Sequence, residues 1–335
     1  MMKKYQIVGV GNALVDVLAH CEDSFLTDMS IDKGVMQLID TDRAAELYGK
    51  MGPAQEVSGG SAANTIAGVA ALGGRTGFIA KVRDDQLGGI FAHDIKAQGT
   101  DFSTRQALHD YPNETGRCLI LVTPDGERSM NTYLGVSSEL TANDLDIGML
   151  ARTEWIYLEG YLFDSPDNQL AFYKAAEATK PAGGKVSLTL SDPFCVGRHR
   201  DAFRAFVKDH VDLLFCNEHE MQALYETDTL DAAMDIAACE VEIVACTASE
   251  NGAYVLNGGN KIHAPANATK VIDATGAGDM FAAGFLHGLT NGRDLQTCGT
   301  MGCVAAAEAI SHMGARPATD LKLLVADNNL SSLVF

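Results

Sequence analysis

The chain has 335 residues, of which 47% are hydrophobic, and its 25 Lys and Arg against 44 Asp and Glu give a formal net charge of −19. A surface this acidic repels the phosphates of nucleic acids and anionic membranes, so we expect neither as a partner. No apolar run reaches the roughly 20 residues that a membrane-spanning helix needs. The eight cysteines contain no C-x-x-C pair, which favours reduced, mostly buried thiols and a cytoplasmic location.

Short apolar runs alternate with longer helix-like stretches along most of the chain. We expect β-strands at residues 5–11, 76–82, 154–161, 185–190, 211–217 and 241–247. We expect helices at residues 62–74, 88–99, 168–179, 202–210, 218–226 and from Gly278 onward. This alternation favours parallel strands joined by crossover helices. The predicted fold class is therefore α/β, with one doubly wound, mostly parallel sheet flanked by helices.

Two stretches depart from this alternation. Residues 17–40 and 112–134 read as short strands with turns at residues 32–34 and 124–126. We expect these stretches to pair into a small β-sheet that acts as a lid. The main α/β domain would then comprise residues 1–16, 41–111 and 135–335.

The segment DATGAGD at residues 273–279 places two acids around a turn of small residues, in front of an apolar helix. The first amides of a helix have no partner within the helix, and the helix dipole favours an anion there. The small residues Gly276, Ala277 and Gly278 would let an oxyanion approach these amides. Taken alone, Asp279 has two interpretations, as the N-cap of the helix or as a group that takes part in catalysis.

Other polar groups lie where a ligand could reach them. The sequence VSGGSAAN places paired glycines, a serine and Asn64 at the start of an Ala-rich helix, which suits hydrogen bonds to a hydroxylated ligand. Asp16 follows the first apolar strand, where a carboxylate can accept hydrogen bonds from two vicinal hydroxyls. Asn217 and Glu220 stand at the carboxyl end of a buried strand, where α/β folds bind ligands. Beside these groups, we favour the catalytic interpretation of Asp279.

These motifs, in this order, resemble those of the ribokinase-like (PfkB-type) family of carbohydrate and nucleoside kinases. The resemblance covers nearly the whole chain and rests on GGSAAN at 59–64, NEHE at 217–220 and DATGAGD at 273–279. GNALVD at 11–16 and LSDPF at 190–194 point more weakly to the nucleoside branch. The resemblance implies an ATP-dependent phosphotransferase that acts on an alcohol group, the first expected acceptor being the 5′-hydroxyl of adenosine. The alternatives are a sugar kinase for ribose, fructose or a keto-deoxy sugar acid, and an inosine or guanosine kinase.

The resemblance also implies roles for individual residues. Asp279 would be the general base, while the amides of Gly276, Ala277 and Gly278 would stabilise charge on the γ-phosphoryl group. The residues that would bind the acceptor are Asp16, Gly59, Gly60, Asn64 and Tyr161. The residues that would bind ATP are Asn217, Thr247, Gly252, Gly276 and Gly278. Asn217 and Glu220 would organise Mg²⁺ through water molecules.

Further expectations concern the surroundings of this site. A K⁺ site would be formed by carbonyl groups near Asp273 and the turn at 309–314, with Asp273 itself supporting the glycine turn. Arg128 is either a phosphate contact or a solvated strand side chain, and Tyr161 either stacks on a base or is a core aromatic. The expected partners are ATP and a nucleoside or sugar, and the chain is expected to be a monomer or a homodimer. A nucleoside-binding regulator without catalysis would require a damaged base or turn, and both are intact.

Overall fold

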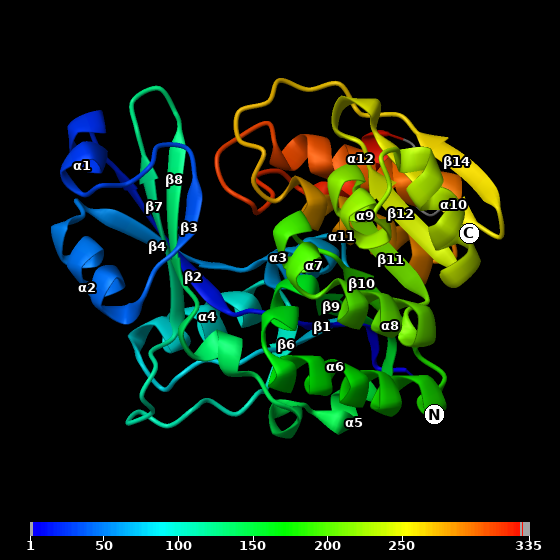
Figure 1. The fold of residues 1–335 in the computed structure, drawn as a ribbon, viewed down its shortest axis with the longest axis horizontal. Helices are drawn as coiled ribbons and strands as arrows, with labels where there is room; N and C mark the ends of the chain where they lie inside the picture. The colour runs from blue at the N-terminus through cyan, green and yellow to red at the C-terminus, as the bar shows by residue number, and fades with distance from the viewer. Residues whose placement is uncertain (1–2, 329, 331–335) are drawn as a thin grey trace.

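A computed structural model of the protein describes residues 3–328 and 330. A nine-stranded sheet forms its centre (Figure 1). Its strands are β1 (Tyr5–Val10), β5 (Thr76–Ile79), β6 (Thr100–Phe102), β9 (Thr153–Glu159), β10 (Lys185–Thr189), β11 (Leu213–Asn217), β12 (Ile243–Thr247), β13 (Ala253–Asn257) and β14 (Asn260–Ala264). The strand order is β14-β13-β12-β11-β10-β9-β1-β5-β6. Pairing is parallel from β6 to β12 and antiparallel from β12 to β14, so the predicted mostly parallel α/β fold is confirmed.

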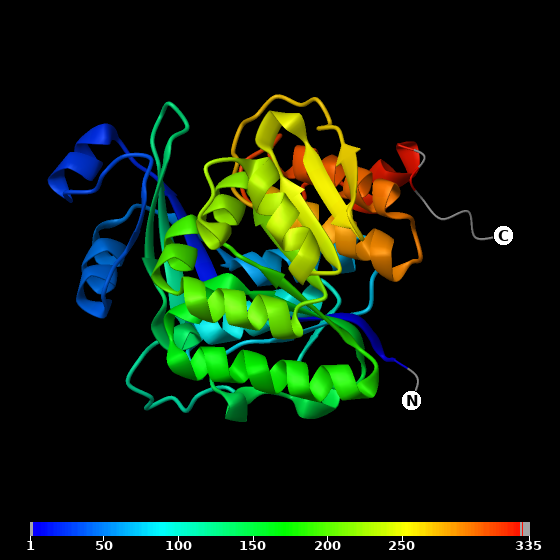
Figure 2. The ribbon, with the colours of Figure 1, turned by 45° about the vertical axis from the view of Figure 1, so that its right-hand side comes forward.

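Helices cover both faces of the large sheet (Figures 1 and 2). One buried apolar cluster joins the sheet to α5 (Ile147–Leu150), α6 (Pro166–Thr179), α7 (Pro193–Arg198), α8 (Arg200–His210), α9 (Glu218–Tyr225) and α10 (Leu230–Glu240). A second cluster joins it to α3 (Ser61–Ala71), α4 (Gln86–Ala97), α11 (Ala277–Thr290) and α12 (Leu295–Ala309), against which α13 (Leu321–Asp327) packs. Among the described residues, none of these helices is long and apolar enough to cross a membrane.

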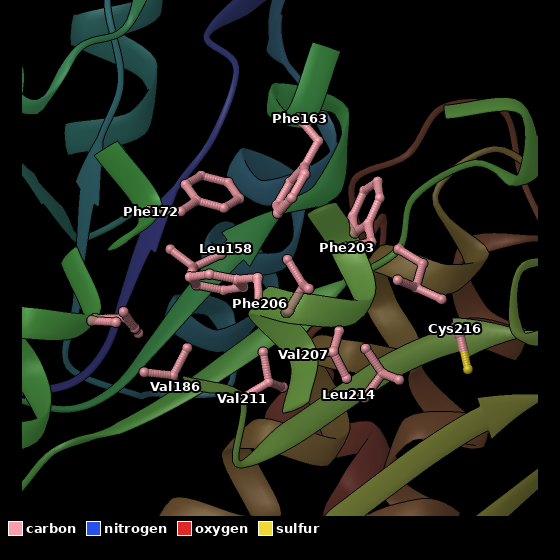
Figure 3. Packing of buried hydrophobic residues seen from close by; sticks show 14 of the residues in the cluster. Leu158, Phe163, Phe172, Val186, Phe203, Phe206, Val207, Val211, Leu214 and Cys216 are labelled. Carbon is pink, nitrogen blue, oxygen red and sulfur yellow. The ribbon is translucent and has the colours of Figure 1, made fainter. Parts of the chain in front are cut away.

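Aromatic side chains fill the first of these clusters (Figure 3). Phe163 stacks on Phe203 with ring centroids 3.9 Å apart, and Phe172 meets Phe163 edge to face at 5.4 Å. Each of these rings is almost fully buried. Their packing fixes α6 and α8 on the sheet beside β9, whose carboxyl end contributes to the site described below.

A second, five-stranded sheet stands beside the main body (Figure 1). Its strands are β2 (Leu14–His20), β3 (Met36–Leu38), β4 (Ala54–Gly59), β7 (Gly116–Val122) and β8 (Arg128–Tyr133), in the order β3-β8-β7-β2-β4. The two stretches that were expected to pair do so, through β2 with β7 and β3 with β8. Two short helices, α1 (Asp23–Asp28) and α2 (Thr41–Lys50), contribute apolar side chains to the outer side of this sheet.

The small sheet extends beyond the predicted limits of the lid. Strand β4 pairs with β2 along its whole length, although residues 41–111 were assigned to the main domain. The sequence of β4, AQEVSG, is mostly polar and lacks the alternation that marks a strand. Residues 23–28 form α1, where a short strand was expected; this helix buries Leu26.

One face of the small sheet points toward the main body. Because side chains alternate along strands, the residues that share it are Asp16, Leu18, Cys118, Ile120, Val122, Arg128, Met130 and Thr132. We call this set the inner face. Arg128 of the inner face contacts Asp273 of the main body, which establishes the direction in which the face points. The inner face therefore carries Asp16 and Arg128 with an apolar patch between them.

Candidate active site

The glycine turn leads directly into α11. Gly276 is the N-cap residue, with φ of 79°, and a Cβ at this position would lie 2.7 Å from the Cβ of Ala315. Both facts require glycine. Within the described chain, no side chain caps α11, which begins at Ala277, and nothing lies within 4 Å of a Cβ added to Gly278. The first amides of α11 are therefore accessible to an anion.

Asp279 is the third residue of α11 and does not cap it. Its Oδ1 accepts a hydrogen bond of 2.7 Å from Ser61 Oγ, and its Oδ2 accepts one of 3.0 Å from Asn64 Nδ2. Burial raises the pKa of Asp279 to about 6, against the hydrogen bonds from Ser61 and Asn64, which lower it. A carboxylate held in place with a pKa near neutrality suits general-base catalysis. The alternative interpretation of Asp279 as an N-cap is therefore wrong.

The expected acceptor-binding residues converge beside Asp279. A Cβ added to Gly59 would lie 2.5 Å from the carboxyl carbon of Asp16, and one added to Gly60 would lie 2.5 Å from the carbonyl oxygen of Asn12. Both glycines are therefore required for the close approach of β2 and the start of α3, which lies beside α11 (Figure 1). Burial raises the pKa of Asp16 to about 6, although the charges of nearby arginines oppose this shift.

The two remaining candidates for binding the acceptor, Asn64 and Tyr161, differ in their surroundings. Asn64 uses both ends of its amide within the protein, because its Oδ1 accepts a hydrogen bond of 2.7 Å from Arg316 Nε while its Nδ2 donates to Asp279. Tyr161 follows β9 and remains 37% exposed. Burial and the carboxylates of Asp192, Glu159 and Asp279 raise the pKa of the Tyr161 hydroxyl. With this exposure Tyr161 is not a core aromatic, and its stacking on a base stays a prediction.

The expected nucleotide-binding residues lie at neighbouring strand ends. Asn217 of β11 is in register with Thr247 of β12, so both mark the carboxyl edge of the large sheet. Gly252 has φ of 82° and is buried, and a Cβ there would lie 2.2 Å from the carbonyl oxygen of Ala264. This contact within the chain accounts for a glycine at 252, and the contact of Gly252 with ATP stays a prediction.

Asn217 and Glu220 form a reciprocal cap at the start of α9. Glu220 N donates to Asn217 Oδ1 at 2.9 Å, while Asn217 N and Nδ2 donate to the Glu220 carboxylate at 2.9 and 2.8 Å. Burial raises the pKa of Glu220 to about 7. Within the described residues, no group of three or more His, Cys, Asp or Glu is placed to hold a metal ion. These oxygen donors fit Mg²⁺ held through water and phosphates, which is its usual mode, and do not fit an all-protein cage.

Asp273 anchors the glycine turn. It is 7% exposed and accepts hydrogen bonds from Thr275 N at 3.0 Å and Gly314 N at 2.9 Å, together with an ion pair from Arg128 Nη1. Although burial opposes the charge, these hydrogen bonds hold the pKa of Asp273 below its ordinary value. Within the described chain, the buried Nε and Nη2 of Arg128 have no partner. These two donors are buried and unsatisfied, so a contact of Arg128 with phosphate stays a prediction, as does the K⁺ site in this region.

Three polar residues of the site were not selected from the sequence. Ser61 lies inside the GGSAAN motif and Arg316 follows the turn at 309–314, where no motif marked it. Glu159 is 1% exposed at the end of β9, accepts hydrogen bonds of 2.6 Å from Asn12 Nδ2 and 2.8 Å from Ala62 N, and has a pKa raised by burial to about 7. An acid directly after an apolar strand is the same signal that selected Asp16, and it could have identified Glu159.

Comparison with known proteins agrees with this geometry, and the fold and site together define a ribokinase-like kinase. The chain belongs to the pfkB family of carbohydrate kinases, whose model matches residues 29–321. The structure of an adenosine kinase from Sinorhizobium meliloti is 45% identical, covers 97% of this chain and 99% of its own, and has a TM-score of 0.89. A probable sugar kinase from Rhizobium etli CFN 42 is 44% identical over 98% of this chain and 100% of its own, with a TM-score of 0.90. The adenosine kinase of Saccharomyces cerevisiae is 28% identical over 92% of this chain and 95% of that protein.

Proposed function

We propose that the protein transfers the γ-phosphoryl group of ATP to the 5′-hydroxyl of adenosine. The observation that carries the proposal is the composition of the inner face of the small sheet. Asp16 can accept hydrogen bonds from two ribose hydroxyls, and the neighbouring Leu18, Cys118 and Ile120 offer an apolar surface to a flat base. A free sugar carries hydroxyls on all sides and gains little from such a surface. The adenosine kinases among the relatives support the same acceptor.

In this proposal each part of the reaction is carried by a group of this chain. Asp279, oriented by Ser61 and Asn64, takes the proton of the acceptor hydroxyl as that oxygen attacks the γ-phosphorus and ADP departs. The amides of residues 276–278 stabilise the charge on the transferred phosphoryl oxygens, and Arg128 adds its free donors. Bound Mg²⁺ supplies further neutralisation of the triphosphate, and Asn217 and Glu220 would hold its water ligands.

A second candidate is a kinase for a sugar or for inosine and guanosine. The similarity to the probable sugar kinase of R. etli favours it, as does the fact that Asp16, Asp279 and the glycine turn would serve any alcohol acceptor. The apolar patch separates nucleosides from sugars: adenosine, inosine and guanosine need it for their base, whereas ribose and fructose do not. Adenosine is separated from inosine and guanosine only by the relative rates.

A coupled assay of ADP release separates the candidates. Adenosine, inosine, guanosine, ribose and fructose are supplied singly with MgATP, and the Asp279→Asn variant gives the background rate. We expect the highest kcat/KM with adenosine. Replacing Ile120 with Asn, on the inner face, should raise KM for adenosine while leaving KM for ATP unchanged. Turnover confined to sugars, or an Ile120→Asn variant with unchanged KM for adenosine, would contradict the proposal.

A further inference from the structure

Arg316 links three separate segments at the back of the site. Its Nε donates to Asn64 Oδ1 at 2.7 Å, its Nη2 donates to the carbonyl oxygen of Ser58 at 3.0 Å, and its Nη1 donates to Gln98 Oε1. These partners belong to α3, to β4 and to the end of α4. A planar guanidinium presents donors in several fixed directions from three nitrogens, so it suits three separate partners better than the single nitrogen of an ammonium group does.

The contact with Asn64 has a directional consequence. A guanidinium only donates hydrogen bonds, so the Asn64 side chain must turn its oxygen toward Arg316. The amide NH₂ of Asn64 then faces Asp279, where it donates to Oδ2 at 3.0 Å. Ser61 donates to the other oxygen, Oδ1, at 2.7 Å. The plane of the Asp279 carboxylate is thereby fixed, and each oxygen keeps a lone pair for the acceptor hydroxyl.

We propose that Arg316 is a positioning residue, which acts through Asn64 to orient the Asp279 carboxylate for proton transfer. The proposal deepens the function assigned above and rests on Asp279 being the base. It differs from a purely structural role, because the link runs through one defined amide. Without the guanidinium, the Asn64 side chain is free to rotate, and its oxygen can face the carboxylate and repel it.

The positive charge of Arg316 also favours the ionised form of Asp279, which is the form that can accept a proton. The titratable groups that interact with the charge of Asp279 come from four parts of the chain. They are Asp16 of β2, Tyr157 and Glu159 of β9, Tyr161 after β9, and Arg316 after α12. Arg316 is the cation of this set. Burial raises the pKa of Asp279, and the charge of Arg316 opposes that rise. Its removal should therefore leave the base protonated up to a higher pH.

The test compares Arg316→Met and Arg316→Lys with the wild type. We expect Arg316→Met to lower kcat by about 10- to 100-fold, the size of effect that misplacement of a reacting group produces, with KM for ATP unchanged. The acid limb of its kcat/KM profile should move to higher pH. Arg316→Lys retains the positive charge but loses the planar guanidinium with its several donors. The acid limb of its kcat/KM profile should therefore stay near that of the wild type, while its kcat should remain reduced. Arg200→Met, which removes an arginine bonded to Glu226 and the carbonyl of Ala223, is the matched control and should retain full activity.

A double-mutant cycle with Asn64→Ala gives the decisive measurement. If Arg316 acts through Asn64, adding Arg316→Met to Asn64→Ala lowers kcat by less than twofold when kcat is measured at a pH above the acid limbs of all the variants. Full additivity of the two losses, or a wild-type kcat in Arg316→Met, would overturn the proposal. Asp279→Asn distinguishes this outcome from failure of the proposed function. If Asp279→Asn keeps its activity, Asp279 is not the base and the proposed mechanism fails; if it is inactive, the result of the cycle bears on Arg316 alone. If Arg316→Met is unstable, Arg316→Lys takes its place, measured alone and in the Asn64→Ala background.

Discussion

Arg128 of β8 and Asp273 of the glycine turn form an ion pair although they lie 145 positions apart in the chain. Their side chains are only 7% and 4% exposed. The pair joins the small sheet to the turn that we propose as the phosphoryl-binding element. Any movement of the small sheet away from the main body must break this contact.

Loss of this ion pair should destabilise the protein. Removing one partner of a buried pair typically costs about 3–5 kcal/mol, and Arg128→Ala should fall near the lower end because Asp273 keeps its hydrogen bonds from Thr275 and Gly314. The free energy of unfolding in urea measures the loss. Arg198→Ala is the control, since its pair with Asp164 is largely exposed and should contribute about 0–1 kcal/mol. Equal losses of unfolding free energy in the two variants would show that the buried pair stabilises the protein no more than the exposed pair does.

Two glycines of the same turn should respond in opposite ways to a methyl group. Gly276→Ala should destabilise the protein by more than about 1 kcal/mol, because the φ of 79° is unfavourable for alanine and the added Cβ meets Ala315. Gly278→Ala should leave stability unchanged or slightly higher, because its Cβ meets nothing in the described chain. We expect Gly278→Ala nevertheless to reduce turnover, since the methyl group occupies the approach to the helix amides. Thermal unfolding and kcat, measured on both variants, test this; a fully active Gly278→Ala enzyme would argue against the anion-binding role.

Asp279→Asn should lower kcat strongly. A positioned general base contributes roughly 10²- to 10⁴-fold, and Asn cannot accept the proton. The fold should persist, because an amide can retain one of the two hydrogen bonds from Ser61 and Asn64. Circular dichroism and steady-state kinetics check both parts. Near-normal turnover would mean that another group takes the proton.

The pH dependence follows from the raised pKa of Asp279. Since burial raises that pKa to about 6, the carboxylate is protonated and inactive at lower pH and ionised above it. We expect kcat/KM to fall as the pH drops through about 6, with a contribution from Asp16, whose pKa is raised by burial to a similar value. The residual activity of Asp279→Asn should lack the Asp279 contribution to this acid limb. A profile that stays flat down to pH 5 would exclude a base with this pKa.

The sequence predicted six of the nine strands of the large sheet, because these six are apolar runs that alternate with helix-like stretches. It missed β6, β13 and β14. It also located Asp16, Gly59, Gly60 and Asp279, whose spacing follows a recognisable motif. Strand β4 escaped prediction since its stability comes from pairing with β2 rather than from its own polar sequence. Tertiary pairing of this kind leaves no local pattern.

Arg316 illustrates a different limit of sequence reasoning. Its partners Ser58, Gln98 and Asn64 lie more than 200 positions away, and a single arginine after a turn has no periodicity. Asn64 was expected to bind the acceptor, yet its amide is held between Arg316 and Asp279. Only the fold reveals that orientation.

The turn after α12 has a consequence for how this enzyme can change over evolution. Gly314 donates to Asp273 at 2.9 Å, and Arg316, two positions later, donates to Asn64 at 2.7 Å. The glycine turn and α3 are therefore both hydrogen-bonded to one short segment of the chain, residues 314–316. Substitutions can be absorbed at the intervening Ala315 only if they remain small, because Gly276 packs against it. An insertion or deletion of one residue here would displace both halves of the site at once, so the length of this turn is constrained as well as its composition.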